Sequence, residues 1–279
     1  MNGKYSTDMF DQPKGFFDES SALHALLAPL PDAAFDRPTQ FKGWTINDII
    51  GHLHAWNWAA DASLCDENAF QDMIATLGRS TRQGLSLLAF EREWRGNLAG
   101  QALLSEWYGF CQAMTDRFTA ADPKMRVKWV GPDMSVRSSI TARLMESWAH
   151  GQAIYDLLGA ERVDTDRIHN IAVLAVNTFG WSFANRGLPV PDTAPRIRLT
   201  APSGAIWEWH AHSPDNLIEG CATQFCQVAA QTRHVKDTQL RVSGDIATRW
   251  IDIIQCFAGP PEEAPRPNTR FKASDLKQN

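Results

Sequence analysis

Apolar residues recur at spacings of three and four through the first part of the chain, the pattern of helices that bury one face. The segments that show it most clearly are residues 16–30, residue 45 to the mid-sixties, residues 98–121, and a fourth run that ends at residue 158. A weaker pattern predicts a short helix over residues 69–77, followed by a polar loop. Four amphipathic helices predict a bundle, in which sites form between facing helices.

Local signals indicate where two of these helices begin and end. Thr45 followed by Asp48 has the form of a capping box, so a helix should start directly after Trp44. Ser135 or Ser138 can cap the fourth helix. Gly159 stands in the usual position just past a helix C-terminus.

The pattern changes after residue 160. Short runs over residues 197–200 and 205–210 predict a hairpin, with a third strand at 240–242. Helical patterns cover residues 167–185, 217–231 and 245–257. We therefore expect a mainly α protein in three parts: an antiparallel four-helix bundle over residues 1–160, a smaller α+β domain over 161–265, and a polar tail over 266–279.

Composition and charge exclude several classes of protein. Among 279 residues, 44% are hydrophobic and 21% are charged, which is ordinary for a soluble globular chain. The net charge of −5, without a block of basic residues, argues against a nucleic-acid partner. No run approaches the roughly 20 apolar residues of a membrane span, and the polar start lacks a secretion signal. Five cysteines without framework spacing indicate reduced thiols. These features predict a cytoplasmic protein that acts on a small molecule, and they leave a homo-oligomer open.

Glu146 and His150 are the centre of the candidate chemistry. They stand four residues apart in the fourth predicted helix, so both side chains lie on one face, a turn apart. His52, in the second predicted helix, can supply a third donor. Two imidazoles and one carboxylate suit a divalent metal with a position left open for water or substrate. Zinc is the leading candidate, although nickel, iron and manganese accept the same ligands.

Other histidines compete with this set. His54 lies about 200° round the helix from His52, so both cannot face one metal. His24 is more typical of a packed side chain. His210 and His212 could face one side of a strand, but no nearby carboxylate has a convincing role. A glutamate four residues before a histidine also occurs as a plain surface pair.

Four further residues are candidates for the surroundings of the site. Asp48 lies one turn before His52 and could orient that imidazole through its second nitrogen, or simply cap the helix. The chain has 11 Trp, and such residues line pockets as well as fill cores. Trp56 and Trp148 are therefore candidates for pocket lining, and Arg82 for anion binding, with packing or solvent exposure as the alternatives.

Three motifs carry a resemblance to a known family. They are Phe41-x-Gly-Trp-Thr-x-x-Asp-x-x-x-His-Leu53, Met145-Glu-x-Trp-Ala-His-Gly151 and Asp156-Leu-Leu-Gly159. In them the chain resembles the N-terminal domain of the mycothiol-dependent maleylpyruvate isomerase family, within the wider DinB/YfiT-like metal-binding bundles. That family's metal ligands fall on His52, Glu146 and His150.

The second part of the chain resembles a different domain. The runs Asp215-Asn-Leu-Ile-Glu-Gly220 and Asp237-Thr-x-Leu-x-Val-x-Gly244 look like the short domain labelled for wyosine base formation, which accompanies such bundles. An acidic chain without a basic patch gives no support for chemistry on tRNA.

The resemblance implies a metal that activates a low-molecular-weight thiol, which adds to an electrophilic substrate. The leading function is therefore a divalent-metal-dependent thiol transferase or isomerase acting on a small molecule, with a metal-activated thiol or water. The chain departs from the isomerase over residues 67–99 and in its Trp-rich ending, so the substrate stays open. Two alternatives remain: a non-haem iron oxygenase with a two-histidine, one-carboxylate site, and a metal-binding protein without enzymatic activity.

Overall fold

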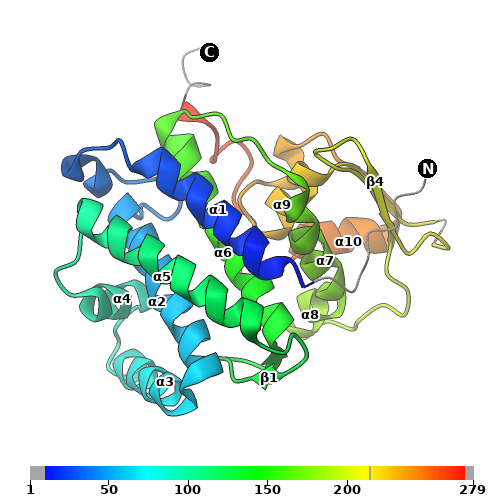
Figure 1. Cartoon of the computed structure of the whole chain (residues 1–279). Helices are drawn as coiled ribbons and strands as arrows, with labels where there is room; N and C mark the ends of the chain where they lie inside the picture. Colours follow the sequence, from blue (N-terminus) through cyan, green and yellow to red (C-terminus); the bar gives the residue numbers. More distant parts are fainter. Residues whose placement is uncertain (1–9, 214, 274–279) are drawn as a thin grey trace.

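Four long helices form the bundle that the sequence predicts. The computed structural model describes residues 10–213 and 215–273, and in it the helices are α1 (Gln12–Leu27), α2 (Ile46–Cys65), α5 (Gly100–Ala120) and α6 (Val136–Leu158). They pack in a ring in which α1 contacts α5 and α6, and α2 contacts the same two helices (Figure 1). A short 3-10 helix, η1 (Asp32–Asp36), lies in the connection between α1 and α2.

Neighbouring helices in the ring run in both relative directions. Gly15 faces Leu144 and Gly151 faces Leu23, so α1 and α6 run parallel. Helices α1 and α5 run antiparallel, because Ser21 contacts Tyr108 whereas Leu27, further along α1, contacts Gln101 near the start of α5. Since α2 runs parallel to α5, as described below, α2 and α6 are antiparallel as well. The mainly helical first part is thus confirmed, and its ring contains two antiparallel and two parallel neighbouring pairs.

The second parallel pair arises from the crossover between α2 and α5. The side chains of Asn57 and Asp61 on α2 bond Cys111 and Arg117 on α5, which shows that these helices run parallel. Residues 66–99 carry the chain back to the end at which α2 began. They hold α3 (Glu67–Arg82) and α4 (Leu87–Arg95), which lie on one side of the bundle in Figure 1.

The crossover differs from its prediction. The helix expected over residues 69–77 extends to Arg82, so the predicted loop is mostly helical, and α4 was not predicted at all. Two buried residues are found in each of these helices, Phe70 and Met73 in α3 and Phe90 and Glu91 in α4. Further apolar residues, Ala69, Ile74 and Leu77 of α3 and Trp94 of α4, pack beside the buried ones, so both helices do have an apolar face. Their many charged and polar residues favoured a loop in the prediction instead.

The second part combines a mixed sheet with short helices, as predicted. The sheet has the order β4 (Ile206–Trp209), β3 (Arg196–Thr200), β5 (Leu217–Cys221), β6 (Arg241–Ser243). Only β3 and β5 pair in parallel; the other neighbours are antiparallel. The helices are α7 (His169–Asn177), α8 (Phe179–Ala184), α9 (Ala222–Ala229) and α10 (Asp245–Ile253), with short 3-10 helices η2 (Asp166–Ile168) and η3 (Val235–Asp237).

Two predicted helices of this part are corrected. The run over residues 217–231 begins as strand β5, because Leu217–Cys221 pairs with β3, and becomes helix only at Ala222. The run over 167–185 is divided into α7 and α8 at Thr178, whose hydroxyl bonds the carbonyls of Leu174 and Ala175. Such side-chain bonds compete with the regular helical pattern.

One hydrophobic core runs through both parts of the described chain. It includes Trp148 of α6, Ile171 of α7 and Trp250 of α10. Within residues 10–213 and 215–273, no helix combines the length and apolar character needed to cross a membrane. Residues 266–273 of the polar tail lie against the rest of the fold, through Phe271 to Gln40 and Lys272 to Glu161; the remainder of the predicted tail, 274–279, lies outside the described residues.

Candidate metal centre and the adjoining cavity

Helices α2 and α6 position the predicted ligands. The capping box at the start of α2 is present: the Thr45 side chain accepts a bond from the Asp48 amide, and the Asp48 carboxylate accepts one from the Thr45 amide. Ser135 caps α6, and Gly159 ends it in the left-handed conformation, with φ 65°. With both helix starts fixed and the helices antiparallel, His52 lies opposite Glu146.

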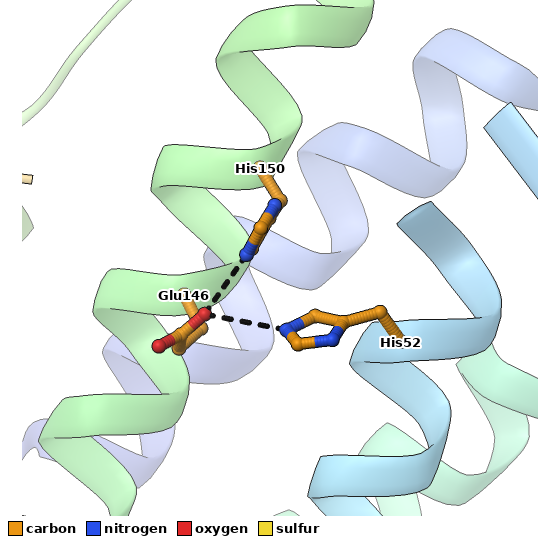
Figure 2. A group of neighbouring side chains, drawn as sticks. All are labelled: His52, Glu146 and His150. Carbon is orange, nitrogen blue, oxygen red and sulfur yellow. Dashed lines mark ion pairs between the residues drawn. The ribbon is translucent and has the colours of Figure 1, made fainter. Parts of the chain in front are cut away.

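The three predicted ligands meet at one point between these helices (Figure 2). Oε2 of Glu146 lies 3.0 Å from Nε2 of His150 and 3.5 Å from Nε2 of His52. One donor atom from each of the three residues lies within 4.8 Å of the others. A tetrahedral zinc ion holds its donors about 3.3 Å apart, as its usual bond lengths require. The group could therefore hold a metal ion.

A buried carboxylate supports His52 from behind. Nδ1 of His52 lies 2.8 Å from Oε1 of Glu91, which also accepts a bond from Nε1 of Trp56. A carboxylate at Nδ1 favours the proton on that nitrogen, so the other nitrogen is left to bind a metal. Nε2 of His52 is buried and has no hydrogen-bond partner in the described part of the chain. Its nearest charged partner is Oε2 of Glu146 at 3.5 Å, so this nitrogen points to the place where a metal would be bound.

Glu91 lies on α4, the helix that the sequence did not predict. The helix comes close to α2 at Gly51, where a Cβ atom would lie 3.0 Å from Cδ of Arg95. The absence of a side chain at Gly51 thus allows the approach. Because Glu91 is 39 residues from His52 in the sequence and belongs to no motif of the ligands, no sequence pattern indicated its role.

The charges of the group are strongly coupled. Burial alone would lower the pKa of His52, but the charges and hydrogen bonds of Glu91 and Glu146 outweigh it and raise the pKa to about 9. Burial, and then the charge on His52, lower the pKa of His150. Burial would raise the pKa of Glu146, but His150, His52 and Arg143 hold it well below the usual range. In the metal-free protein His52 is therefore protonated at neutral pH, and metal binding must release that proton.

Two aromatic residues of the Phe41 to Leu53 motif hold His150. The Trp44 ring stacks on the His150 imidazole with centroids 5.9 Å apart, and Phe41 meets it edge-on at 5.0 Å. Trp44 also meets His52 edge-on at 5.4 Å. These contacts restrict both imidazoles to orientations that face Glu146.

A cavity of about 710 Å³ adjoins the centre, and His52 and Glu146 form part of its wall. One wall is the loop between the short paired strands β1 (Arg126–Val127) and β2 (Met134–Ser135). The opposite wall comes from the second part of the chain, through α7, α8 and the segment after α10. Most of the lining is apolar: Trp56, Leu87, Trp129, Val130, Pro132, Met134, Met145, Leu174, Trp181 and Phe257. The cavity can thus enclose an organic molecule beside the ligands.

Two further residues line the cavity that the sequence analysis did not predict, Arg143 and Cys256. Arg143 is 3% exposed, and its guanidinium lies over the Trp129 ring at 5.7 Å. It precedes Glu146 by three residues, so its place on the same helical face could have been predicted. Cys256 also lines the cavity. Burial, and then the charge on Glu146, raise the pKa of its thiol, which therefore stays neutral.

Of the four residues predicted to surround the site, Trp56 is the one that lines the cavity. Asp48 caps α2 and pairs with Arg92 at 2.8 Å, while Glu91 is the partner of His52. The predicted orienting role of Asp48 is thus corrected, and its capping alternative is what the structure shows. The two functions are separated because α4 supplies a carboxylate nearer to the imidazole.

Arg82 and Trp148 lie away from the centre. Arg82 lines a separate cavity between α3 and Trp129. Trp148 is fully buried, and its Nε1 donates to Asp164 at 2.8 Å. Trp148 lies on α6, as Glu146 and His150 do, but its side chain is part of the core. It therefore has the alternative role, packing, and does not line the cavity.

The competing histidines make packing and backbone contacts. His54 packs edge-on against Trp94 and Phe110, and His24 stacks on Tyr108. Nδ1 of His210 contacts the carbonyl of Pro195. These contacts agree with the choice of His52 as the third ligand.

Comparisons with known proteins agree with this geometry. The family described as "Mycothiol maleylpyruvate isomerase N-terminal domain" matches residues 16–155. Two proteins of Mycobacterium tuberculosis, from strains CDC 1551 / Oshkosh and ATCC 25618 / H37Rv, are each described as uncharacterized. Each is 33% identical to this chain over 243 residues, which are 87% of this chain and 93% of the relative.

Two crystal structures share the fold. One is of the mycothiol-dependent maleylpyruvate isomerase, with 18% identity and a TM-score of 0.50. The other is of a mutant of that isomerase in which a histidine is replaced by alanine, with 16% identity and a TM-score of 0.51. Each comparison covers 79% of this chain and 88% of the other. The shared fold therefore extends beyond the bundle into the second part.

Proposed function

The chain belongs to the mycothiol maleylpyruvate isomerase N-terminal domain family, and from that premise we propose that it is a divalent-metal-dependent thiol transferase or isomerase. Its substrate would be a small electrophilic molecule, and its co-substrate a low-molecular-weight thiol. We propose zinc as the metal, because two imidazoles and a carboxylate are common ligands of catalytic zinc. The observation that carries the proposal is the meeting of one donor atom each from His52, Glu146 and His150, within 4.8 Å of one another, beside a cavity.

His52, Glu146 and His150 would hold the metal, and each ligand is oriented by a neighbour. Glu91 fixes the tautomer and direction of His52, and Trp44 fixes the ring of His150. When bound, the metal supplies a Lewis acid that lowers the pKa of a coordinated thiol or water. The apolar walls would reduce the water around a bound molecule, and charge interactions there are stronger where less water surrounds them.

The thiol is proposed to come from outside the chain. Cys256 is the cysteine that lines the cavity, and its pKa is raised by burial. A neutral, buried thiol is a poor nucleophile. An external thiol is also suggested by one solved structure that shares the fold, which is of a mycothiol-dependent isomerase.

Elemental analysis of protein purified without a histidine tag tests the metal centre. We expect stoichiometric zinc in the wild type and its loss in Glu146→Ala and His150→Ala. His24→Ala, which changes a histidine stacked on Tyr108 away from the centre, is the matched control and should keep its metal. A wild type without stoichiometric metal would contradict the proposal, and iron retained under anaerobic purification, with oxygen-dependent turnover, would favour the oxygenase alternative.

Turnover tests the reaction class. Maleylpyruvate and a simple epoxide would each be incubated with the protein, with and without mycothiol, and the loss of the electrophile followed. We expect thiol-dependent consumption that is absent in His52→Ala. Consumption that needs no thiol would assign the reaction to activated water instead. No consumption of any electrophile by metal-loaded protein would favour a metal-binding role without catalysis.

A further inference from the structure

The guanidinium of Arg143 lies on the cavity wall without adequate partners. The side chain is 3% exposed, and its Nε and Nη1 have no hydrogen-bond acceptor among the described residues. Its Nη2 lies 3.8 Å from Oε1 of Glu146, which is beyond hydrogen-bond distance. A buried charged donor without an acceptor is costly, so such a group in a folded protein needs an explanation.

Metal binding would leave the positive charge of Arg143 with even less negative charge around it. Glu146 would then be a ligand, and the charges of a divalent metal and Arg143 together would exceed those of Glu146 and Glu91. Asp133 also lines the cavity, but it is paired with Lys128 at 2.9 Å. With a metal bound, the wall around Arg143 would therefore be positive. In either state the unpaired N–H groups of Arg143 favour an anionic ligand.

The type of donor narrows the kind of anion. A guanidinium presents N–H groups in pairs that match the two oxygens of a carboxylate. The guanidinium carbon of Arg143 lies over the Trp129 ring, 5.7 Å from its centroid, and this contact helps to hold the group at the cavity wall. Among the described residues that line the cavity, Arg143 is the one lysine or arginine. The cavity therefore offers a cationic partner for one carboxylate group. The remaining walls, including Trp56, Trp181 and Phe257, suit an apolar and flat body.

We propose that Arg143 binds the carboxylate of an apolar monocarboxylic acid and determines the specificity of the cavity for that class of substrate. Because Arg143 is on the same helical face as Glu146, an acid held there places its apolar part in the cavity next to the ligand group. This inference rests on the proposed function in one respect: it assumes that the acid bound by Arg143 is the substrate.

Matched neutral and charged probes test the inference by calorimetry. Phenylacetate and phenylacetamide have nearly the same shape and differ in charge. We expect zinc-loaded wild type to bind phenylacetate about 10-fold or more tightly than phenylacetamide. Arg143→Met should weaken phenylacetate binding by about 10-fold to 100-fold, the effect of losing a charged hydrogen bond, and should leave phenylacetamide unchanged. Arg82→Met, outside the cavity, is the matched control and should bind as the wild type.

A second variant separates a binding role from a folding role. Arg143→Lys keeps the charge but loses the planar pair of donors, so its phenylacetate affinity should lie between those of wild type and Arg143→Met. Circular dichroism checks that each variant is folded; if Arg143→Met is not, Arg143→Lys carries the comparison. Equal binding of the two probes by wild type, binding of neither, or an unchanged preference in both folded variants would overturn the inference. Maleate carries two carboxylates and little apolar surface. If it bound more tightly than phenylacetate, the proposal that the ligand is an apolar monocarboxylic acid would be wrong.

Carboxylates also bind metals directly, so the titrations are repeated after the metal is removed with a chelator. We expect the preference for phenylacetate to depend on Arg143 in both states. The preference for phenylacetate could instead be lost when the metal is removed but kept in Arg143→Met. That result would show that the carboxylate binds the metal, and it would overturn the inference. Protein that binds no metal but still prefers phenylacetate through Arg143 would contradict the proposed function alone.

Discussion

The centre depends on Glu91 although this residue is not one of the predicted ligands. Glu91 forms a buried pair with His52, the one ligand that it contacts. Glu91 is 2% exposed, and one of its oxygens serves both His52 and Trp56. The ligands themselves were predictable from the sequence, because a helical spacing of four and a family motif mark them. Glu91 and Arg143 were not predicted, because their roles depend on partners in space and on the absence of partners.

At the level of this pair, Glu91→Gln should weaken zinc binding by about 10-fold to 100-fold, the usual effect of removing a carboxylate behind a histidine ligand. The amide keeps the shape but no longer favours a proton on Nδ1. Competition with a chromophoric chelator measures the affinity. Glu93→Gln, two residues away and exposed on α4, is the control, and equal zinc affinity in the two variants would show that Glu91 has no such role.

The raised pKa of His52 predicts how the stability of the metal-free protein depends on pH. The pKa is about 9 in the folded state and 6.5 as the ordinary value, so the folded protein holds the proton more tightly. The stabilisation is complete below pH 6.5 and is lost as the pH rises through 9, by up to about 3 kcal/mol.

Urea unfolding of chelator-treated protein at several pH values measures this effect. The free energy of unfolding should fall between pH 7 and pH 9.5 in the wild type more steeply than in His52→Gln, where this proton is missing. Parallel pH profiles for the two proteins would show that His52 is not protonated in the folded state.

Among the elements, helix ends were the most predictable features and short helices the least. The capping box at Thr45 and the Gly159 terminus follow from local chemistry that a sequence displays directly. Helix α4 spans nine residues, of which Glu91, Arg92, Glu93 and Arg95 are charged, and so short a run is hard to distinguish from a connecting segment. Strand β5 was predicted as helix because α9 follows it at once, with Cys221 as both the last strand residue and the cap position.

The capping box gives a prediction for α2 as an element. Thr45→Ala should lower the free energy of unfolding by about 1 kcal/mol, because the Asp48 amide loses its side-chain acceptor. Urea unfolding measures the change. Thr76→Ala, at an exposed position within α3, should change stability by no more than a few tenths of a kcal/mol. Equal midpoints for the two variants would contradict the role of the cap.

At the scale of the whole molecule, the cavity is formed jointly by both parts of the chain. Thr178, Trp181 and the segment that begins at Cys256 face the ligands on α2 and α6. The sequence predicted both parts and their fold classes. It did not predict the cavity, because its walls come from residues more than 100 positions apart, which no periodicity or motif brings together.

Trp181→Ala should separate ligand binding from metal binding at this scale. Removing the ring opens the apolar wall contributed by α8, so we expect phenylacetate affinity to fall by about 10-fold, from lost apolar burial, while zinc content stays unchanged. Trp58→Ala, which lies on α2 and packs against Trp94, is the control. Loss of zinc in Trp181→Ala would show instead that the second part supports the metal centre itself.

Helix α4 bonds α2 at two successive residues, and this has a consequence for the rate at which a metal leaves. Glu91 holds the imidazole of His52, and Arg92 holds Asp48 one turn earlier. For His52 to rotate away from Glu146, it must break its bond to Glu91, so the dissociation of a bound metal would be slowed by a helix that contributes no ligand. If the centre holds a metal, residues 66–99 would therefore set its lifetime without changing the ligands.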